Sequence, residues 1–200
     1  MKIVNFNNYT RVVDMSALDS YCHEHGRRVR YAKDEIFVQE GLVGRYMAFV
    51  EQGYFKYTTL TSAGNAAVVG FAFEGECICD FNNSYHHHPS EVSIIAGCDT
   101  IVWQVEFNEI IDFIERCLPK FHDQASDAVF IEIYRRYLDM YRKTPKERYL
   151  DLLSKYPEVF NIVPIKDIAS FLNVTPTYLS RIRRALAKTK FSNPEKYTFP

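Results

Sequence analysis

The residue pattern of this chain changes near Glu106, and this change constrains the fold more than any other feature. Between Arg28 and Val105 the chain has short runs rich in Val, Ile, Phe, Tyr and Thr, separated by turn residues. After Glu106, apolar residues recur at intervals of three and four. The first pattern is typical of short antiparallel strands and the second of amphipathic helices. The chain is therefore predicted to be α+β, with a β part followed by a helical part.

The β part is predicted to form a jelly roll of about eight short strands, because turn signals follow one another so closely. The expected strands include Glu35–Gln39, Tyr46–Glu51, Tyr54–Leu60, Ala66–Phe73, Val92–Ala96 and Thr100–Val105. Asn82 and Asn83 are expected in a turn. A short helix, Ser16–His25, is expected before the strands, with Gly26 ending it.

Pro119 divides the next segment into a short helix and a long one, the long one at about Lys120 to Lys143. The long helix carries an apolar stripe, which predicts the seam of a homodimer. The stripe also fits a helix that folds back on its own β part. Thr144, Pro145 and Glu147 predict a capped helix after it. The expected domains are residues 1–105, a sensor, residues 106–143, a dimerisation helix, and residues 144–200, a DNA-binding domain.

The net charge of the chain is −1, so charge identifies a partner only through its distribution. Between Val174 and Phe191 there is no carboxylate. The cations of that stretch are Arg181, Arg183, Arg184, Lys188 and Lys190. A local basic stretch on a neutral protein indicates a localised anionic partner.

The five cysteines form no regular framework, and the N-terminus lacks the apolar core of a signal peptide. Both observations favour a reducing, cytoplasmic location. No run approaches the length of about 18 apolar residues that a membrane span needs, so no membrane partner is expected.

The segment from Pro164 to Lys188 predicts a helix-turn-helix. A helix at Ile165–Leu172 is followed by a tight turn and by a second helix with Thr175 as its cap and Pro176 at its first position. Ala169 is small where two helices would cross. Asn173 is a residue that tolerates a left-handed conformation.

The second helix presents hydrogen-bonding and cationic side chains with no acid, which is the inventory that a helix in the major groove needs. The predicted DNA-binding residues are Lys166, Thr175, Thr177, Tyr178, Ser180, Arg181 and Arg184. The alternative is an ordinary helical hairpin with a solvated basic face.

These residues resemble a known family. IASFLNVTPTYLSRIRRAL resembles the helix-turn-helix signature of the catabolite activator protein and fumarate-nitrate reduction regulator (Crp/Fnr) family, and PKERYLDLLSKYPEVFNIVPIKDIA resembles its Bacteroides-like members. VQEGLVGRYMAFVEQGYFKY is similar to strands of the family's cyclic-nucleotide-binding-like jelly roll. Arg181 matches the family's DNA-reading arginine, whereas Pro176 and Thr177 imply a different DNA target. The short tail KFSNPEKYTFP implies that the wing of a winged helix is short or absent.

The resemblance also implies an effector pocket in the jelly roll. Its expected residues are Gly75, Glu76, Cys77, Ser90 and Glu91. Gly75-Glu76 matches the ribose-binding pair of the family, but Ser90 stands where an arginine would hold the cyclic phosphate, and Glu91 would repel one. A small-molecule effector is therefore expected, cyclic AMP is not expected to bind in the usual way, and no cofactor is predicted.

His86, His88 and Glu91 support an alternative from another class, a metal-dependent enzyme of the cupin type. Their spacing departs from the cupin motif by one residue. The sequence has no Gly-rich phosphate loop or nucleophile elbow. The chain is therefore interpreted as a non-enzymatic, homodimeric transcription regulator whose partners are a palindromic DNA operator and RNA polymerase.

Overall fold

The structure is a computed structural model that describes the backbone of residues 6–192 and the side chains of residues 6–186. The chain forms two compact units, residues 1–139 and residues 140–200. None of the helices in this described part combines the length and apolar character that crossing a bilayer requires.

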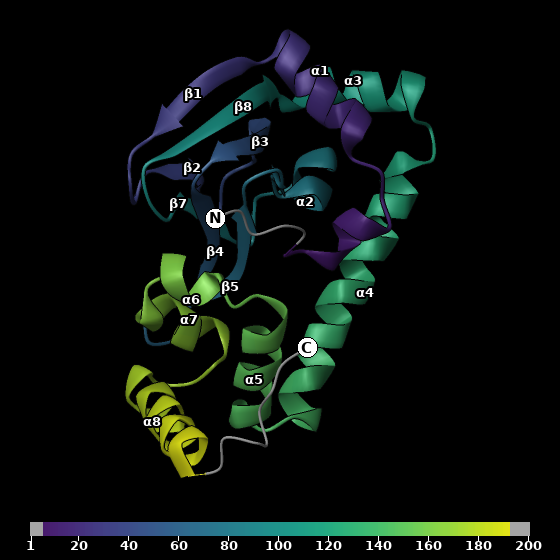
Figure 1. The fold of residues 1–200 in the computed structure, drawn as a ribbon. Coiled ribbons are helices and arrows are strands. Elements are labelled where there is room, and N and C mark those ends of the chain that lie inside the picture. The colour runs from purple at the N-terminus through teal and green to yellow at the C-terminus, as the bar shows by residue number, and fades with distance from the viewer. Residues whose placement is uncertain (1–5, 193–200) are drawn as a thin grey trace. The chain divides into compact units, whose positions relative to one another are not determined.

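The first unit is a jelly roll accompanied by helices (Figure 1). Its strands are β1 (Arg27–Tyr31), β2 (Ile36–Val38), β3 (Tyr46–Gln52), β4 (Tyr54–Leu60), β5 (Ala66–Phe73), β6 (Cys77–Ile78), β7 (Ser93–Ala96) and β8 (Thr100–Glu106). Its helices are the 3-10 helix η1 (Asn8–Arg11), α1 (Ser16–His25), α2 (Phe81–Tyr85), α3 (Phe107–Cys117) and most of α4 (Phe121–Arg142). The strands form two four-stranded antiparallel sheets in the orders β1-β8-β3-β6 and β2-β7-β4-β5.

The core of the jelly roll lies between the two sheets. Ala48 and Val102 point inward from the first sheet, and Phe55, Ala72 and Ile94 from the second; all are fully buried. Alternate residues of a strand face the same side, so Ala48 and Val50 of β3 both point into this core. The predicted jelly roll is therefore confirmed.

A close contact between two neighbouring strands depends on glycine. The Gly97 amide donates a hydrogen bond to the Tyr54 carbonyl at 2.9 Å. A Cβ atom at position 97 would lie 2.0 Å from Cε2 of the Tyr54 ring, which is far inside van der Waals contact. The ring therefore packs directly on the backbone of Gly97.

The strand and helix predictions agree with the structure to within a residue or two. β1 and β6 were not individually predicted. The turn expected at Asn82 and Asn83 is instead the short helix α2, whose single turn is too brief to leave a helical period in the sequence.

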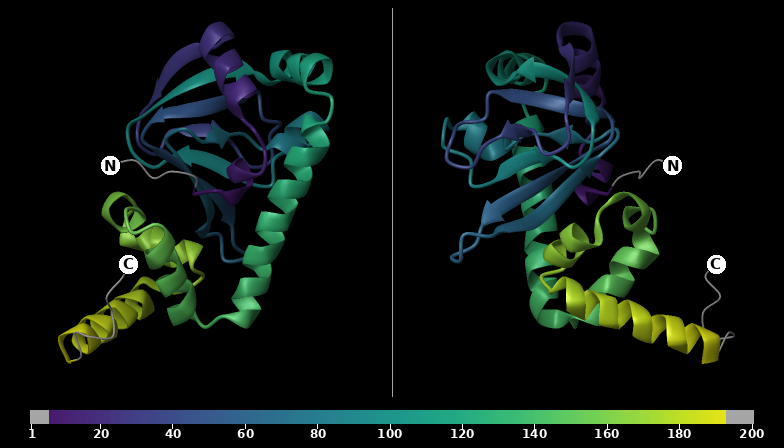
Figure 2. Two further views of the ribbon diagram at one scale, coloured as in Figure 1. Left: turned by 45° about the vertical axis from the view of Figure 1, so that its right-hand side comes forward. Right: turned by 90° about the vertical axis from the view of Figure 1, so that its left-hand side faces the viewer.

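The two halves of helix α4 differ in how far the apolar stripe is covered. In its first half, Phe121, Ala125 and Ala128 are buried against the jelly-roll unit, beside which this half lies in both views of Figure 2. Farther along, Phe130 and Tyr134 stack on each other, with ring centroids 5.8 Å apart, and remain exposed. The first half thus folds back on its own domain, whereas the second half has an uncovered apolar face.

The second unit is helical. Its helices after α4 are α5 (Pro145–Lys155), α6 (Val159–Ile162), α7 (Ile165–Phe171) and α8 (Pro176–Ser192). α5 begins with the predicted capping box, in which Thr144 and Glu147 exchange hydrogen bonds. Tyr149, Val159, Ile168 and Leu179 are among its buried residues. The tail in which a wing was expected to be short or absent includes residues 193–200, which lie outside the described part.

Candidate nucleic-acid interface and internal cavity

A tight turn joins α7 to α8. Asn173 adopts a φ of 53°, the left-handed conformation that its position predicted. The turn is closed by hydrogen bonds from the Asn173 amide to the Ser170 carbonyl, 2.8 Å, and from the Val174 amide to the Ala169 carbonyl, 2.9 Å. Ala169 is fully buried. The small buried side chain and the left-handed residue thus lie in α7 and in the turn after it, as the sequence predicted.

Helix α8 begins with the expected cap and buries one face. The Thr175 hydroxyl accepts a hydrogen bond from the Tyr178 amide at 3.2 Å. Leu179 and Ile182, three residues apart, are buried in the second unit. The side chains between them therefore point away from the core of that unit.

The exposed face of α8 has no acidic side chain. The seven residues predicted to bind DNA are all exposed: Lys166, Thr175, Thr177, Tyr178, Ser180, Arg181 and Arg184. The structure thus places them on the accessible side of α7, the turn and α8. Their contact with DNA stays a prediction.

Two arginines of the second unit have structural partners. The Arg183 guanidinium lies beside the Tyr149 phenol. Burial raises the pKa of Tyr149, and Arg183 opposes part of this shift. Arg148 donates hydrogen bonds to the Lys143 carbonyl at 2.8 Å and to the Leu172 carbonyl at 3.1 Å. Arg148 therefore ties the start of α5 to the end of α7. This role could not be predicted, because a single arginine in a helix carries no signal of its partner.

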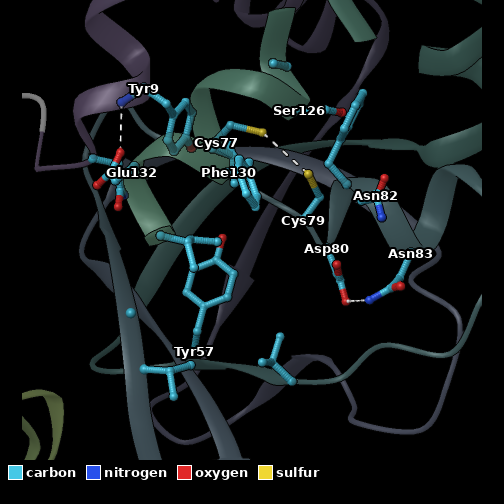
Figure 3. A pocket seen from close by; sticks show the side chains of 18 of the residues that line it. Tyr9, Tyr57, Cys77, Cys79, Asp80, Asn82, Asn83, Ser126, Phe130 and Glu132 are labelled. Atoms are coloured by element: carbon cyan, nitrogen blue, oxygen red, sulfur yellow. Dashed lines mark hydrogen bonds between the residues drawn. The ribbon is translucent and has the colours of Figure 1, made fainter. Parts of the chain in front are cut away.

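A cavity of about 590 Å³ lies in the first unit, between the jelly roll and α4 (Figure 3). Its wall comes from four separate segments: the N-terminal residues around η1, the strands β3, β4 and β5, the stretch from β6 through α2 to Val92, and α4. Most of the lining side chains are apolar or aromatic. Its volume is in the range of small-molecule sites.

The predicted effector residues are divided between the cavity and its surroundings. Cys77 and Glu91 line the cavity. Among the described residues Gly75, Glu76 and Ser90 are not part of its wall. Gly75 forms a turn with a φ of 82°. Ser90 is buried, and its hydroxyl donates to Asp80 Oδ2 at 2.6 Å, so a carboxylate stands where a phosphate would need a cation.

Glu76 is buried and held by the N-terminal segment. Its carboxylate accepts hydrogen bonds from the Asn7 amide (2.7 Å), from Asn7 Nδ2 (3.0 Å) and from the Phe73 amide (2.9 Å). Burial raises the pKa of Glu76, although these three donors oppose the shift. The residue expected to meet a ribose is therefore engaged within the protein.

Cys77 and Cys79 form a pair on the cavity wall, with their Sγ atoms 4.0 Å apart (Figure 3). The interaction with Cys79, followed by burial, raises the pKa of Cys77. Cys77 is thus held as a neutral thiol and behaves as a small apolar group.

The histidine cluster does not form a metal centre in the described residues, where no three His, Cys, Asp or Glu side chains have the geometry to hold an ion. The rings of His86 and His88 lie 5.9 Å apart, and His122 of α4 lies 6.0 Å from His86. Glu91 lies at the cavity instead. No observation therefore favours the cupin-type alternative.

Comparisons with known proteins agree with the fold. Residues 28–117 match the model of the cyclic nucleotide-binding domain family. FixK2 from Bradyrhizobium japonicum has a similar structure, with a TM-score of 0.69 and 19% identity over 82% of this chain and 85% of that one. The c-di-GMP responsive global regulator CLP from Xanthomonas campestris gives a TM-score of 0.66 and 15% identity over 88% and 93% of the two chains.

A protein from Eubacterium rectale described as a transcriptional regulator of the Crp/Fnr family gives a TM-score of 0.67 and 15% identity over 92% of this chain and 89% of that one. A search of curated protein sequences found no match.

Proposed function

We propose that this chain, which carries a cyclic nucleotide-binding domain and has the fold of Crp/Fnr family regulators, is a sequence-specific DNA-binding transcription regulator that acts as a homodimer. The observation that carries the proposal is the exposed, acid-free face of α8, which starts at a side-chain cap and follows a tight turn. Arginines and hydroxyls on such a face can read base edges in the major groove.

The homodimer is supported by the uncovered apolar face of α4. Phe130, Ile133 and Tyr134 are 66%, 58% and 50% exposed, and their spacing puts them on one side of the helix. An exposed stripe of this kind marks an interaction site. Pairing with a second copy would cover it and would give the dimer two α8 helices, one for each half of a palindromic operator. RNA polymerase is the further partner, and the cytoplasm the location, that such a regulator implies.

The DNA-binding role is tested with two matched arginine variants. Arg181→Ala removes a cation from the exposed face, and we expect affinity for a site selected from genomic fragments to fall by about 1–3 kcal/mol in a mobility-shift titration at fixed salt. Arg183→Ala removes the cation that lies beside Tyr149, and we expect it to weaken specific and non-specific binding alike. If both variants lose the same amount of specificity, Arg181 is not part of the DNA interface.

The homodimer is tested by placing a charge on the uncovered face. Tyr134→Glu should convert the dimer to a monomer in sedimentation velocity, because an unpaired carboxylate would be buried in the seam. Arg135→Glu introduces the same charge at the next position, and the dimer should persist. A Tyr134→Glu variant that sediments as wild type would contradict the proposed seam.

The jelly-roll cavity is the proposed effector site, and cyclic AMP does not bind there in the usual way. Ser90 and Asp80 occupy the place where the resemblance requires a cation, and Glu91 lines the cavity. An unpaired phosphate beside carboxylates would be destabilised. We expect no heat of binding from micromolar cyclic AMP in calorimetry, and a clear isotherm would overturn this part of the proposal.

A further inference from the structure

We propose that the cavity between the jelly roll and α4 binds an uncharged, largely aromatic or aliphatic small molecule that carries one hydrogen-bonding group, and that it excludes anions. This inference goes beyond the proposed function by naming the ligand class, and it rests on that function only for its regulatory consequence.

The charge of the wall excludes an anion. The carboxylates of Asp80, Glu91 and Glu132 line the cavity, and Arg136 is its one lining cation among the described residues. Arg136 already donates to Glu132 Oε1 at 3.1 Å and to the Val69 carbonyl at 3.2 Å. Because Arg136 is already paired with Glu132, an entering anion would meet the carboxylates of Asp80 and Glu91 without an unpaired lining cation to balance them. Charges inside a cavity interact more strongly than in water.

The phenols of the wall add no charge. Burial raises the pKa of both Tyr9 and Tyr57 well above the usual value, so each stays protonated at neutral pH. Phe71, Phe81 and Phe121 supply aromatic surface. An apolar ligand of matching size would lose unfavourable contact with water and gain dispersion contacts with these rings.

One polar side-chain atom of the wall has no hydrogen-bond partner among the described residues. The Ser126 hydroxyl of α4 is buried and makes no hydrogen bond, and Ser126 lines the cavity (Figure 3). An unsatisfied buried hydroxyl is costly, so a ligand group that accepts or donates a hydrogen bond there is favoured. Ser126 thus supplies a hydrogen-bonding contact beside the aromatic surface of the wall.

The ligand would touch the helix that carries the proposed dimer seam. Ser126, Val129, Phe130 and Ile133 contribute to the cavity wall from α4. Phe130 and Ile133 also belong to the uncovered apolar face. A molecule in the cavity therefore contacts the same side chains that pairing would cover, which gives it a direct route to altering DNA affinity.

The charge selectivity is tested with two fluorescent probes of the same shape. N-phenyl-1-naphthylamine is uncharged, and 8-anilinonaphthalene-1-sulfonate has the same rings with an added sulfonate. We expect the uncharged probe to bind the full-length protein saturably, with a Kd at least about tenfold lower than that of the sulfonate. Equal or tighter binding of the sulfonate would overturn the inference.

Three variants locate the binding. Val129→Trp fills the cavity and should weaken the uncharged probe by about tenfold or more. Gln124→Trp adds the same indole to an exposed position of α4 outside the cavity, and binding should be unchanged. Glu91→Lys changes an exposed residue at the cavity, so folding should be kept, and it should raise sulfonate affinity by about tenfold. If neither Val129→Trp nor Glu91→Lys changes probe binding, the probes do not bind in this cavity and the inference is overturned.

A mobility-shift assay on the same protein separates this inference from the proposed function. If DNA is bound but the uncharged probe is not, the cavity assignment is wrong and the regulator proposal stands. If the probe binds as described but no DNA site can be selected, the cavity assignment is supported and the regulator proposal is wrong. If both bind, saturating probe should change DNA affinity by at least about threefold.

Discussion

Removal of the Asn7 side chain should lower the free energy of unfolding of the jelly roll, and this loss should be larger at higher pH. Asn7 Nδ2 donates to Glu76 Oε2 at 3.0 Å and to the Phe71 carbonyl at 2.9 Å, and Glu76 is only 2% exposed. Asn7→Ala deletes both hydrogen bonds but keeps the backbone amide that bonds to Glu76 Oε1. The change therefore leaves a buried carboxylate with two of its three protein donors.

The size of the loss depends on the charge of Glu76. A hydrogen bond to a charged group contributes about 1.5–3 kcal/mol and one to a neutral carbonyl about 1 kcal/mol, so we expect a loss of about 2–4 kcal/mol at pH 7. Burial raises the pKa of Glu76 in the folded state. The protonated carboxyl therefore adds most to the free energy of unfolding below its ordinary pKa. This contribution is lost as the pH rises through the pKa of the folded state. Removing a donor raises the folded pKa further. Near pH 4, below the ordinary pKa of a glutamate, the loss should shrink to about 1–2 kcal/mol.

The measurement is urea unfolding followed by the fluorescence of Trp103, the only tryptophan of the chain, which lies in β8. Asn8→Ala is the matched control, because Asn8 is the exposed neighbour, and its loss should stay within about 0.5 kcal/mol. Glu76→Gln combined with Asn7→Ala should show strong coupling between the two positions. An Asn7→Ala loss that is the same at both pH values would refute the reasoning.

Three further changes concern the second unit, and hydrogen exchange followed by mass spectrometry measures each. Asn173→Ala should lower the opening free energy of α7 and α8 by about 1–2 kcal/mol because φ is 53°, whereas Asn173→Gly should not; equal losses would contradict the backbone explanation. Thr144→Ala removes the cap of α5 and should lower its protection by about 1 kcal/mol, and unchanged exchange would show that the cap contributes nothing. Ala169→Leu should lower the opening free energy by about 1–3 kcal/mol because it overpacks a fully buried site. No change would mean that the packing around position 169 can accommodate a larger side chain.

The elements of the fold could largely be predicted from the sequence because each depends on local chemistry. Runs rich in Val, Phe, Tyr and Thr between turn residues predicted β4 and β5, and the helical period interrupted by Pro119 separated α3 from α4. The left-handed Asn173 and the Thr175 cap were also predictable, because both reflect the conformational preferences of single residues.

The cavity could be predicted only in part because its wall is assembled from distant segments. Asn7 and Glu76 are 69 positions apart, and Tyr9 and Glu132 are 123 apart. No local pattern records such a pairing. Ser90 was expected to face a ligand, but its hydroxyl donates a hydrogen bond to Asp80. This contact depends on the folded structure and not on the local sequence.

The contact between Gly97 and the Tyr54 ring has an evolutionary consequence. With 2.0 Å between the ring and any added Cβ, each of these positions restricts the other. Homologous sequences that keep an aromatic side chain at position 54 should keep glycine at position 97, and those that acquire alanine there should carry a smaller residue at position 54. The two columns of an alignment should therefore covary, although they are 43 residues apart.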